Sequence, residues 1–132
     1  MRGKTPKRPT EGELAILRVL WERGPSTVRT VHERLGGTQR TGYTTTLKLM
    51  QIMAAKGLVK RDQSRMTHVY APAIEEGPTR RRLVRDFLDR AFGGSAGKLV
   101  MQALDAGDIS PEELQEIRQL LEKKGAANER AR

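Results

Sequence analysis

The sequence contains no cysteine among its 132 residues, and this absence removes several kinds of site at once. Disulfides, thiolate metal sites and cysteine nucleophiles are excluded, and the composition fits a reducing cytoplasm, where we expect the protein to act. The chain also lacks any run of about 18 apolar residues, so we expect no membrane-spanning segment and no membrane partner. Its basic start lacks the apolar stretch of a secretory signal, and residues 1–9 are therefore predicted to form a flexible basic arm.

Catalytic and metal-binding motifs are missing as well. His32 and His68 are the only histidines, and they stand on different predicted elements, without the ligand spacing that zinc needs. No glycine-rich phosphate loop, G-x-S-x-G pattern or HExxH pattern occurs. We therefore expect no metal site, no cofactor and no enzymatic activity.

What the sequence has in excess is basic charge, with a formal net charge of +9. Residues 1–75 carry 14 Lys and Arg against 6 Asp and Glu, which gives +8, whereas residues 76–132 carry 11 against 10, which gives +1. A polyanion is the natural partner of such a basic first half. A basic domain can also serve solubility alone, so charge by itself supports nucleic-acid binding only weakly.

Helix signals organise the first part of the chain. Thr10 and Glu13 form a capping-box pattern, which predicts a helix that ends at Gly24-Pro25. Ser26 is predicted to cap a second short helix, which leads into a turn-rich connection at residues 36–40. A short helix, a small loop and a further helix with a polar outer face suit a helix-turn-helix.

The further helix is predicted from Tyr43 to Lys56, with Gly57 ending it in the left-handed conformation. Its inner face at helical spacing consists of Thr46, Leu49, Met50 and Met53. The outer face is polar and free of acid, and it consists of Thr44, Lys48, Gln51 and Ala55, with Thr45 and Ile52 beside them. Hydroxyl, amide and ammonium groups can reach base edges and phosphates in a major groove. The alternative is a half-buried surface helix whose outer face is exposed to solvent and binds nothing.

A β-hairpin is predicted directly after this helix. Residues 58–62 and 67–72 have strand-like composition, and residues 63–66 form the loop between them. A hairpin behind a recognition-type helix is called a wing, and its tip meets DNA backbone or minor groove. The basic residues of this wing are Lys60, Arg61 and Arg65, although Asp62 dilutes their charge.

Three more helices are predicted over residues 76–124, after a boundary at Glu75–Pro78 where Gly77-Pro78 interrupts regular backbone structure, and the first of them is expected from Thr79 to Phe92. Ser110 and Glu113 repeat the capping-box pattern at the start of the last helix, and residues 125–132 are expected to be a frayed tail. Three short helices in roughly fifty residues cannot bury their apolar side chains alone, so self-association as a homodimer is predicted. Packing of these helices onto the first domain is the alternative. The residues expected in the dimer interface are Leu83, Val84, Phe87, Leu88, Leu99, Val100, Leu114, Ile117, Leu120 and Leu121.

With the elements in this order, the chain resembles the penicillinase-repressor family (BlaI/MecI type). The matching motifs are Glu13-Leu14 with Val19-Leu20-Trp21, Tyr43-Thr44-Thr45, Lys56-Gly57-Leu58-Val59, His68-Val69-Tyr70-Ala71-Pro72, Leu88-Asp89-Arg90-Ala91-Phe92-Gly93-Gly94 and Ser110-Pro111-Glu112-Glu113-Leu114 with Leu120-Leu121. The resemblance implies a mainly α fold with a small β-hairpin wing: a winged helix-turn-helix domain at residues 10–75, then a three-helix dimerisation region at residues 76–124. It also implies a dimeric transcriptional repressor that binds a palindromic double-stranded DNA operator.

In drug-responsive members of this family, a membrane metalloprotease sensor triggers cleavage of the repressor at an Asn-Phe bond in the dimerisation region. The matching pair here is Gln102-Ala103, so the chain departs from the pattern that would make a membrane protease sensor its partner. Copper-sensing relatives use cysteine pairs, which this chain lacks.

The predicted function is therefore sequence-specific repression by a homodimer. Phosphate contacts are expected from Arg40, Lys60, Arg61 and Arg65, and base contacts from Thr44, Thr45, Lys48 and Gln51. Two other functions stay open from the sequence: a winged-helix module that binds a protein partner, and a DNA-binding protein without sequence preference.

Overall fold

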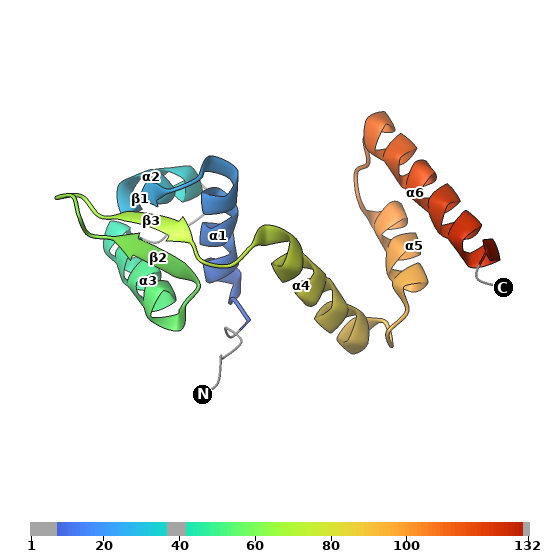
Figure 1. Ribbon diagram of the computed structural model, residues 1–132, viewed down its shortest axis with the longest axis horizontal. Helices are drawn as coiled ribbons and strands as arrows, with labels where there is room; N and C mark the ends of the chain where they lie inside the picture. The colour runs from blue at the N-terminus through green and yellow to red at the C-terminus, as the bar shows by residue number, and fades with distance from the viewer. Residues whose placement is uncertain (1–7, 37–41, 131–132) are drawn as a thin grey trace. The chain divides into compact units, whose positions relative to one another are not determined.

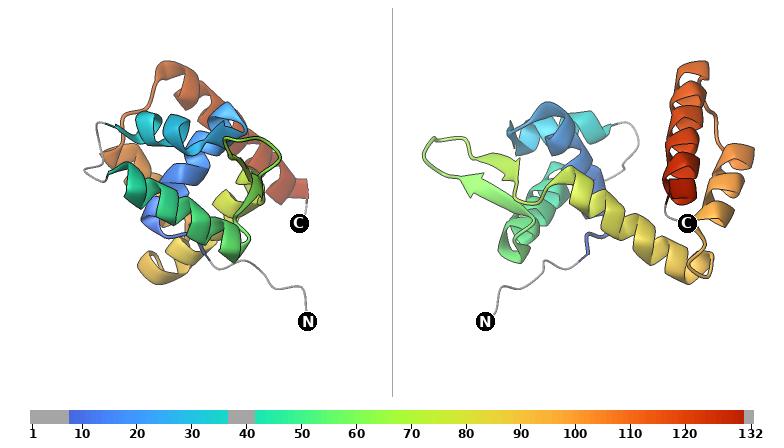
Figure 2. Two further views of the ribbon diagram at one scale, coloured as in Figure 1. Left: turned by 90° about the vertical axis from the view of Figure 1, so that its left-hand side faces the viewer. Right: turned by 45° about the vertical axis from the view of Figure 1, so that its right-hand side comes forward.

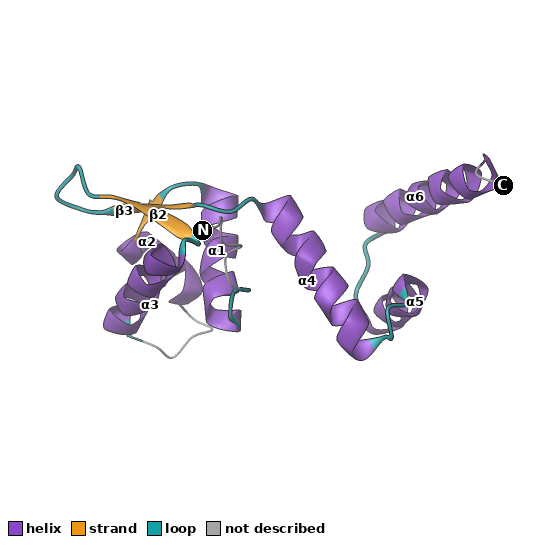
Figure 3. Cartoon of the chain, turned by 60° about the horizontal axis from the view of Figure 1, so that its bottom comes forward, coloured by secondary structure: helices purple, strands orange, loops and turns teal. Residues whose placement is uncertain are grey.

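The computed structural model describes residues 8–36 and 42–130, and the chain divides into two compact units, Met1–Val84 and Arg85–Arg132. Most of the arm predicted at residues 1–9 lies outside the described residues, as does most of the connection at 36–40. Among the described residues, strands occur only in the first unit, and the second unit is built from helices (Figures 1 and 3). The domain limits predicted at residues 75 and 124 remain predictions.

Six helices and three short strands make up the regular structure of the described residues. Along the chain they are α1 (Glu11–Arg23), β1 (Ser26–Thr27), α2 (Val28–Leu35), α3 (Tyr43–Lys56), β2 (Val59–Asp62), β3 (Val69–Pro72), α4 (Glu76–Ala91), α5 (Ala96–Ala106) and α6 (Pro111–Arg130). The elements from α1 to β3 form a winged helix-turn-helix, and three helices follow β3, which confirms the predicted fold class. None of the helices in the described ranges is both long and apolar enough to cross a membrane.

The sheet of the first unit is antiparallel, with strand order β1-β3-β2. Tyr70 of the central strand β3 pairs with Ser26 of β1 on one side and with Arg61 of β2 on the other. The prediction that Ser26 caps the second helix is therefore wrong. Thr27 caps it instead, by accepting a hydrogen bond from the Thr30 N–H at 3.1 Å, because α2 begins at Val28 and the Ser26 hydroxyl donates to the Gly24 carbonyl.

The hydrophobic core lies among α1, α2, α3 and the sheet (Figure 1). Its buried members are Ile16, Leu17, Leu20, Val28, Val31, Met50, Met53, Leu58, Val59 and Tyr70. Trp21 packs against this cluster, and its indole N–H donates to the carbonyl of Ile74 at 3.0 Å, which ties α1 to the segment after β3. Burying these side chains supplies most of the stabilisation of the unit.

The ends of α3 agree with the sequence prediction. Gly57 adopts φ 83° and ψ 13°, and the N–H of Leu58 donates to the carbonyl of Met53 at 2.9 Å. This left-handed ending suits glycine because other residues would place a Cβ against the backbone. The chain thereby leaves α3 and enters β2 directly, so the hairpin follows α3 without a long loop.

A buried ion pair joins the start of α1 to the end of α3. Glu13 is only 2% exposed, and the Lys56 ammonium donates to both of its carboxylate oxygens, at 2.7 and 2.9 Å. Glu13 also completes the predicted capping box, because it accepts from the Thr10 N–H at 2.9 Å. Burial raises the pKa of Glu13, but the hydrogen bonds from Lys56 and Thr10 and the lysine's charge outweigh burial and lower its pKa from 4.5.

The helices α4, α5 and α6 contain no buried residue among those described. Phe87 and Phe92 pack edge to face, with ring centroids 5.6 Å apart. The C-terminal end of α4 is closed by Gly94, whose N–H donates to the Leu88 carbonyl at 2.9 Å and whose φ of 84° suits glycine.

Two predicted helix limits in this part of the chain are wrong. α4 begins at Glu76 and not after Gly77-Pro78, because proline is tolerated in the first turn of a helix, where its missing N–H has no partner to lose. α6 continues through Gly125 to Arg130, in place of the frayed tail predicted from residue 125. One glycine costs a helix about 1 kcal/mol, and the residues around it are good helix formers.

We expect Lys56→Met to lower the free energy of unfolding of the first unit by about 2 kcal/mol at neutral pH, because it leaves the Glu13 carboxylate buried without its cation. Urea titration followed by the fluorescence of Trp21, the single tryptophan of the chain, measures this change. Lys48→Met on the same helix is the matched control, since Lys48 is exposed and its loss should cost less than about 0.5 kcal/mol.

The cost of Lys56→Met should also depend on pH. The folded-state pKa of Glu13 is lowered. The ion pair therefore stabilises the fold at pH values above about 4.5, and this stabilisation is lost as the pH falls through the folded-state pKa. The gap between wild type and Lys56→Met should therefore narrow in acid. A gap that stays constant would show that the carboxylate does not contribute through its charge.

Candidate nucleic-acid interface

The two faces of α3 differ sharply in exposure. Thr46, Met50 and Met53 are buried against the core of the first unit. The side chains predicted to contact bases are all exposed on the other face: Thr44, Thr45, Lys48 and Gln51. The structure therefore presents hydroxyl, amide and ammonium groups together on one helix surface, and no carboxylate lies among them.

The start of α3 is suited to an anion. Its N-cap is Gly42, which has no side chain to cap the helix, and its first turn contains no acidic residue. The N–H groups and the positive end of the helix dipole there favour negative charge, of the kind that a phosphate carries.

Contacts between α2 and α3 hold the helix-turn-helix together. The Thr46 hydroxyl lies 2.9 Å from Nδ1 of His32, and the ring of Tyr43 meets the ring of His32 edge to face, with centroids 5.9 Å apart. The Arg29 guanidinium lies 5.3 Å from the centroid of the Tyr43 ring, within cation–π range. These contacts place an additional cation, Arg29, beside the start of α3, a position that the sequence analysis did not identify.

The wing carries exposed basic side chains, as its sequence suggests. Lys60 and Arg61 are exposed on β2, and Arg65 is exposed in the loop that follows. Asp62 is also exposed, and it accepts a hydrogen bond from the Ser64 N–H at 2.9 Å. Hydrogen bonds from the Ser64 side chain and backbone lower the pKa of Asp62. The carboxylate thus shapes the turn of the wing, besides reducing its positive charge.

A groove of about 480 Å³ brings the helix-turn-helix and the wing together. Its lining includes Thr27, the N-cap of α2, and Arg29 in its first turn, Tyr43 and Leu47 from α3, and Met66 and His68 from the hairpin. Figure 2 shows the hairpin projecting from the unit beside these helices. The start of α3 and the part of the hairpin that leads into β3 therefore border the same groove.

Met66 is the most exposed large apolar side chain of this surface, with an exposed fraction of 102%. It lies in the predicted hairpin loop, and no role is predicted for it from the sequence. No contact with nucleic acid is predicted from the sequence for Met66, Tyr43 or His68, and only their placement around the groove connects them to the site.

Not every predicted residue can be placed. Arg40 lies outside the described residues. Of the residues predicted for a dimer interface, none is buried, and the ones that are more than 40% exposed are Val84, Phe87, Val100, Leu120 and Leu121.

Known proteins similar to this chain were found by sequence and by structure. A family model described as penicillinase repressor matches residues 9–123. The penicillinase repressor of Bacillus licheniformis is 25% identical over 113 residues, which are 86% of this chain and 88% of that protein. The methicillin resistance regulatory protein MecI of Staphylococcus aureus is 20% identical over 115 residues, which are 87% of this chain and 94% of that protein.

Two further similarities cover less of the chain. The transcriptional regulator BlaI of Mycobacterium tuberculosis is 41% identical over 61 residues, which are 46% of this chain and 44% of that protein. The solution structure of the DNA binding domain of the repressor BlaI matches 57% of this chain and 90% of its own, with a TM-score of 0.49 and 23% identity.

Removing the Asp62 carboxylate should loosen the wing turn. In Asp62→Ala, the Ser64 amide loses its acceptor, and we expect its exchange with water to become about threefold faster. Water-exchange NMR of the Ser64 amide measures the rate. Asp62→Asn is the matched control, because its side-chain oxygen still accepts a hydrogen bond while the charge is gone. Equal acceleration in both variants would contradict a hydrogen-bonding role and leave only charge.

Proposed function

The chain belongs to the penicillinase repressor family, a family of transcriptional repressors, and on that premise we propose that it binds a palindromic DNA operator sequence-specifically as a homodimer. The observation that carries the proposal is the acid-free outer face of α3, which is exposed on a unit whose hairpin also carries exposed basic side chains.

Base recognition falls to α3 in this proposal. An α-helix fits the major groove, where amide and ammonium groups distinguish base edges and threonine methyls contact thymine. Lys48 and Gln51 lie one turn apart, so both reach the same stretch of a groove. The hydroxyls of Thr44 and Thr45 stand at the start of the same helix.

Phosphate contacts supply the greater part of the affinity. On the wing, phosphate contacts are proposed for Lys60, Arg61 and Arg65, which are exposed. At the helix-turn-helix, Arg29 adds a further cation. Each neutralised phosphate releases counterions, so the affinity should fall steeply as salt rises. Arg40 remains a proposed contact from the sequence.

The homodimer is supported by the helices of residues 76–130. None of their described side chains is buried, yet they carry apolar residues at helical spacing on all three helices. Apolar side chains such as Leu120 and Leu121, which are 63% and 57% exposed, gain free energy when a second copy covers them. Two copies related by a two-fold axis would present two α3 helices to a palindrome.

The proposal leaves out a membrane protease sensor. Gln102-Ala103, which stands where some relatives carry the cleaved Asn-Phe bond, lies inside α5. A protease acts on extended chain, so cleavage there would require α5 to unfold locally as well as a different specificity.

We expect Lys48→Ala and Gln51→Ala each to weaken operator binding about tenfold, because each removes a base contact worth about 1–3 kcal/mol. The operator is first isolated by sequencing the genomic fragments that the protein retains, and binding is then measured by gel shift. Lys98→Ala and Gln115→Ala are matched controls, since they remove the same groups from α5 and α6, where both residues are exposed.

The salt dependence of the same gel shifts separates the remaining possibilities. A protein-binding module would show weak binding with no sequence preference near 0.15 M salt. A DNA-binding protein without specificity would keep the steep salt slope but bind scrambled fragments equally well. Either result would overturn the proposed function.

Leu120→Asp combined with Leu121→Asp should convert the protein to a monomer of 14.8 kDa by light scattering, because two charges would have to be buried against the partner copy. Phe87→Asp with Leu88→Asp should act in the same way, although Phe87 also contacts Phe92 within the chain. Operator binding should weaken strongly in both variants, since the two half-sites are then bound independently.

Gln119→Asp is the control for this experiment, because Gln119 is exposed on α6 next to the same residues. It should leave the dimer intact. A Leu120→Asp, Leu121→Asp variant that keeps twice the mass of one chain would place the dimer interface elsewhere.

A further inference from the structure

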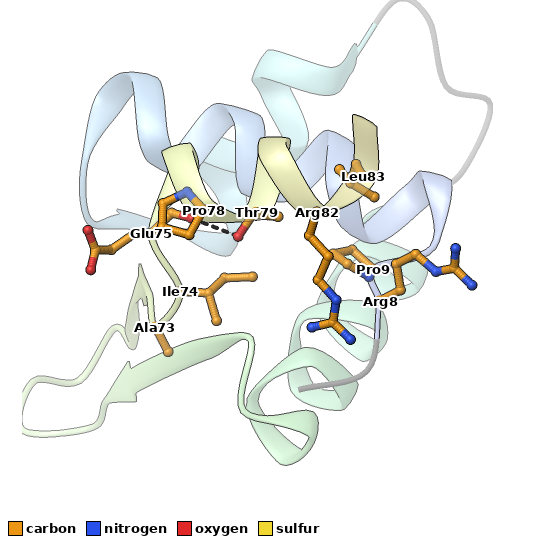
Figure 4. A pocket seen from close by; sticks show the side chains of 9 residues that line it. All are labelled: Arg8, Pro9, Ala73, Ile74, Glu75, Pro78, Thr79, Arg82 and Leu83. Atoms are coloured by element: carbon orange, nitrogen blue, oxygen red, sulfur yellow. Dashed lines mark hydrogen bonds between the residues drawn. The ribbon is translucent and has the colours of Figure 1, made fainter. Parts of the chain in front are cut away.

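A cavity of about 340 Å³ opens within the first unit where α4 begins (Figure 4). Its walls come from the approach to α1, the connection between β3 and α4, and the first turns of α4. Its lining includes the apolar side chains of Pro9, Ile74 and Leu83, the basic side chains of Arg8 and Arg82, and the acidic side chain of Glu75. The lining residues among those described belong neither to α3 nor to the loop between β2 and β3, so the cavity is separate from the nucleic-acid interface.

The backbone that forms one wall of this cavity is already held in place. The Ile74 carbonyl accepts the indole N–H of Trp21 at 3.0 Å, and the Ala73 N–H donates to the Leu58 carbonyl at 2.9 Å. The Glu75 carbonyl accepts the Thr79 hydroxyl at 2.6 Å, shown as the dashed line in Figure 4. The wall is therefore preformed, and a ligand would be recognised by the apolar side chains and the charged groups at the rim.

The charged groups favour an anion. Figure 4 shows Arg82 extending from α4 on the side where Arg8 and Pro9 lie, whereas Glu75 projects on the opposite side. Each guanidinium has five N–H donors in a planar fork, so each can add a carboxylate to the contacts that it makes within the chain. The floor between them is apolar, and the volume falls within the range of small-molecule sites, about 300–1,000 Å³.

We propose that this cavity binds an amphipathic organic monocarboxylate, whose carboxylate pairs with Arg8 and Arg82 and whose apolar body rests on Pro9, Ile74 and Leu83. The chain's own first residues do not fit this chemistry, because residues 1–7 contain Arg2, Lys4 and Lys7 and no acid. Charge of the same sign as the two arginines would repel them. The inference rests on the cavity alone and does not depend on DNA binding.

The experiment uses the full-length protein, with 4-phenylbutyrate as the probe and 4-phenylbutanamide as its uncharged analogue. Trp21 is the single tryptophan, and its indole N–H donates to the carbonyl of Ile74, which lines the cavity, so its one indole NMR cross-peak reports occupancy. We expect 4-phenylbutyrate to shift this cross-peak saturably. The amide should bind about tenfold more weakly, because it forgoes the charge-assisted pairs with arginine.

Arg82→Gln should weaken 4-phenylbutyrate binding about tenfold, whereas the matched control Arg81→Gln should leave it unchanged. Arg81 is exposed, stands on the same helix and does not line the cavity, so it tests for general attraction of the anion to α4. The inference is overturned if no saturable shift occurs up to on the order of 10 mM. It is also overturned if acid and amide bind equally, or if the two arginine variants weaken binding by the same factor.

Discussion

The placement of α3 depends on one buried carboxylate. Glu13 receives the Thr10 N–H from its own capping box and the ammonium of Lys56 from the last residue of α3. A carboxylate that is 2% exposed would be strongly destabilising without such partners, so the fold is held to arrangements in which the end of α3 meets the start of α1. Gly12 permits the close approach, since a Cβ there would come 3.3 Å from Leu49 of α3.

The other end of α3 is held by different means. Its first turns are attached to α2 by the hydrogen bond between His32 and Thr46 and by the contacts of the Tyr43 ring, edge to face with His32 and in cation–π range of Arg29. With both ends of α3 attached to α1 and α2, the outer polar face is exposed to solvent. This exposure is what the proposed DNA recognition requires, and the same core supports the strand pairing of the wing.

The second unit differs from the first in the burial of its apolar side chains. α5 and α6 bury no side chain among the described residues, and their apolar stripes stay half exposed. A single copy of about fifty residues has too little volume to enclose them. In the proposed homodimer, the stability of this unit would therefore depend on protein concentration.

Local signals in the sequence determined the helices, because capping residues, helical spacing of apolar residues and a terminal glycine each act within a few positions. They located α1, α3 and the hairpin, and they separated the inner and outer faces of α3.

Other features were decided only in three dimensions. Ser26 joins a sheet because Tyr70, far along the chain, offers its backbone. In the sequence, Lys56 is only a basic residue at the C-terminal end of a predicted helix, but in the structure its ammonium pairs with the carboxylate of Glu13 on α1. The groove beside the wing and the cavity at the start of α4 also gather side chains from distant segments, and no spacing along a chain records which segments the core will bring together.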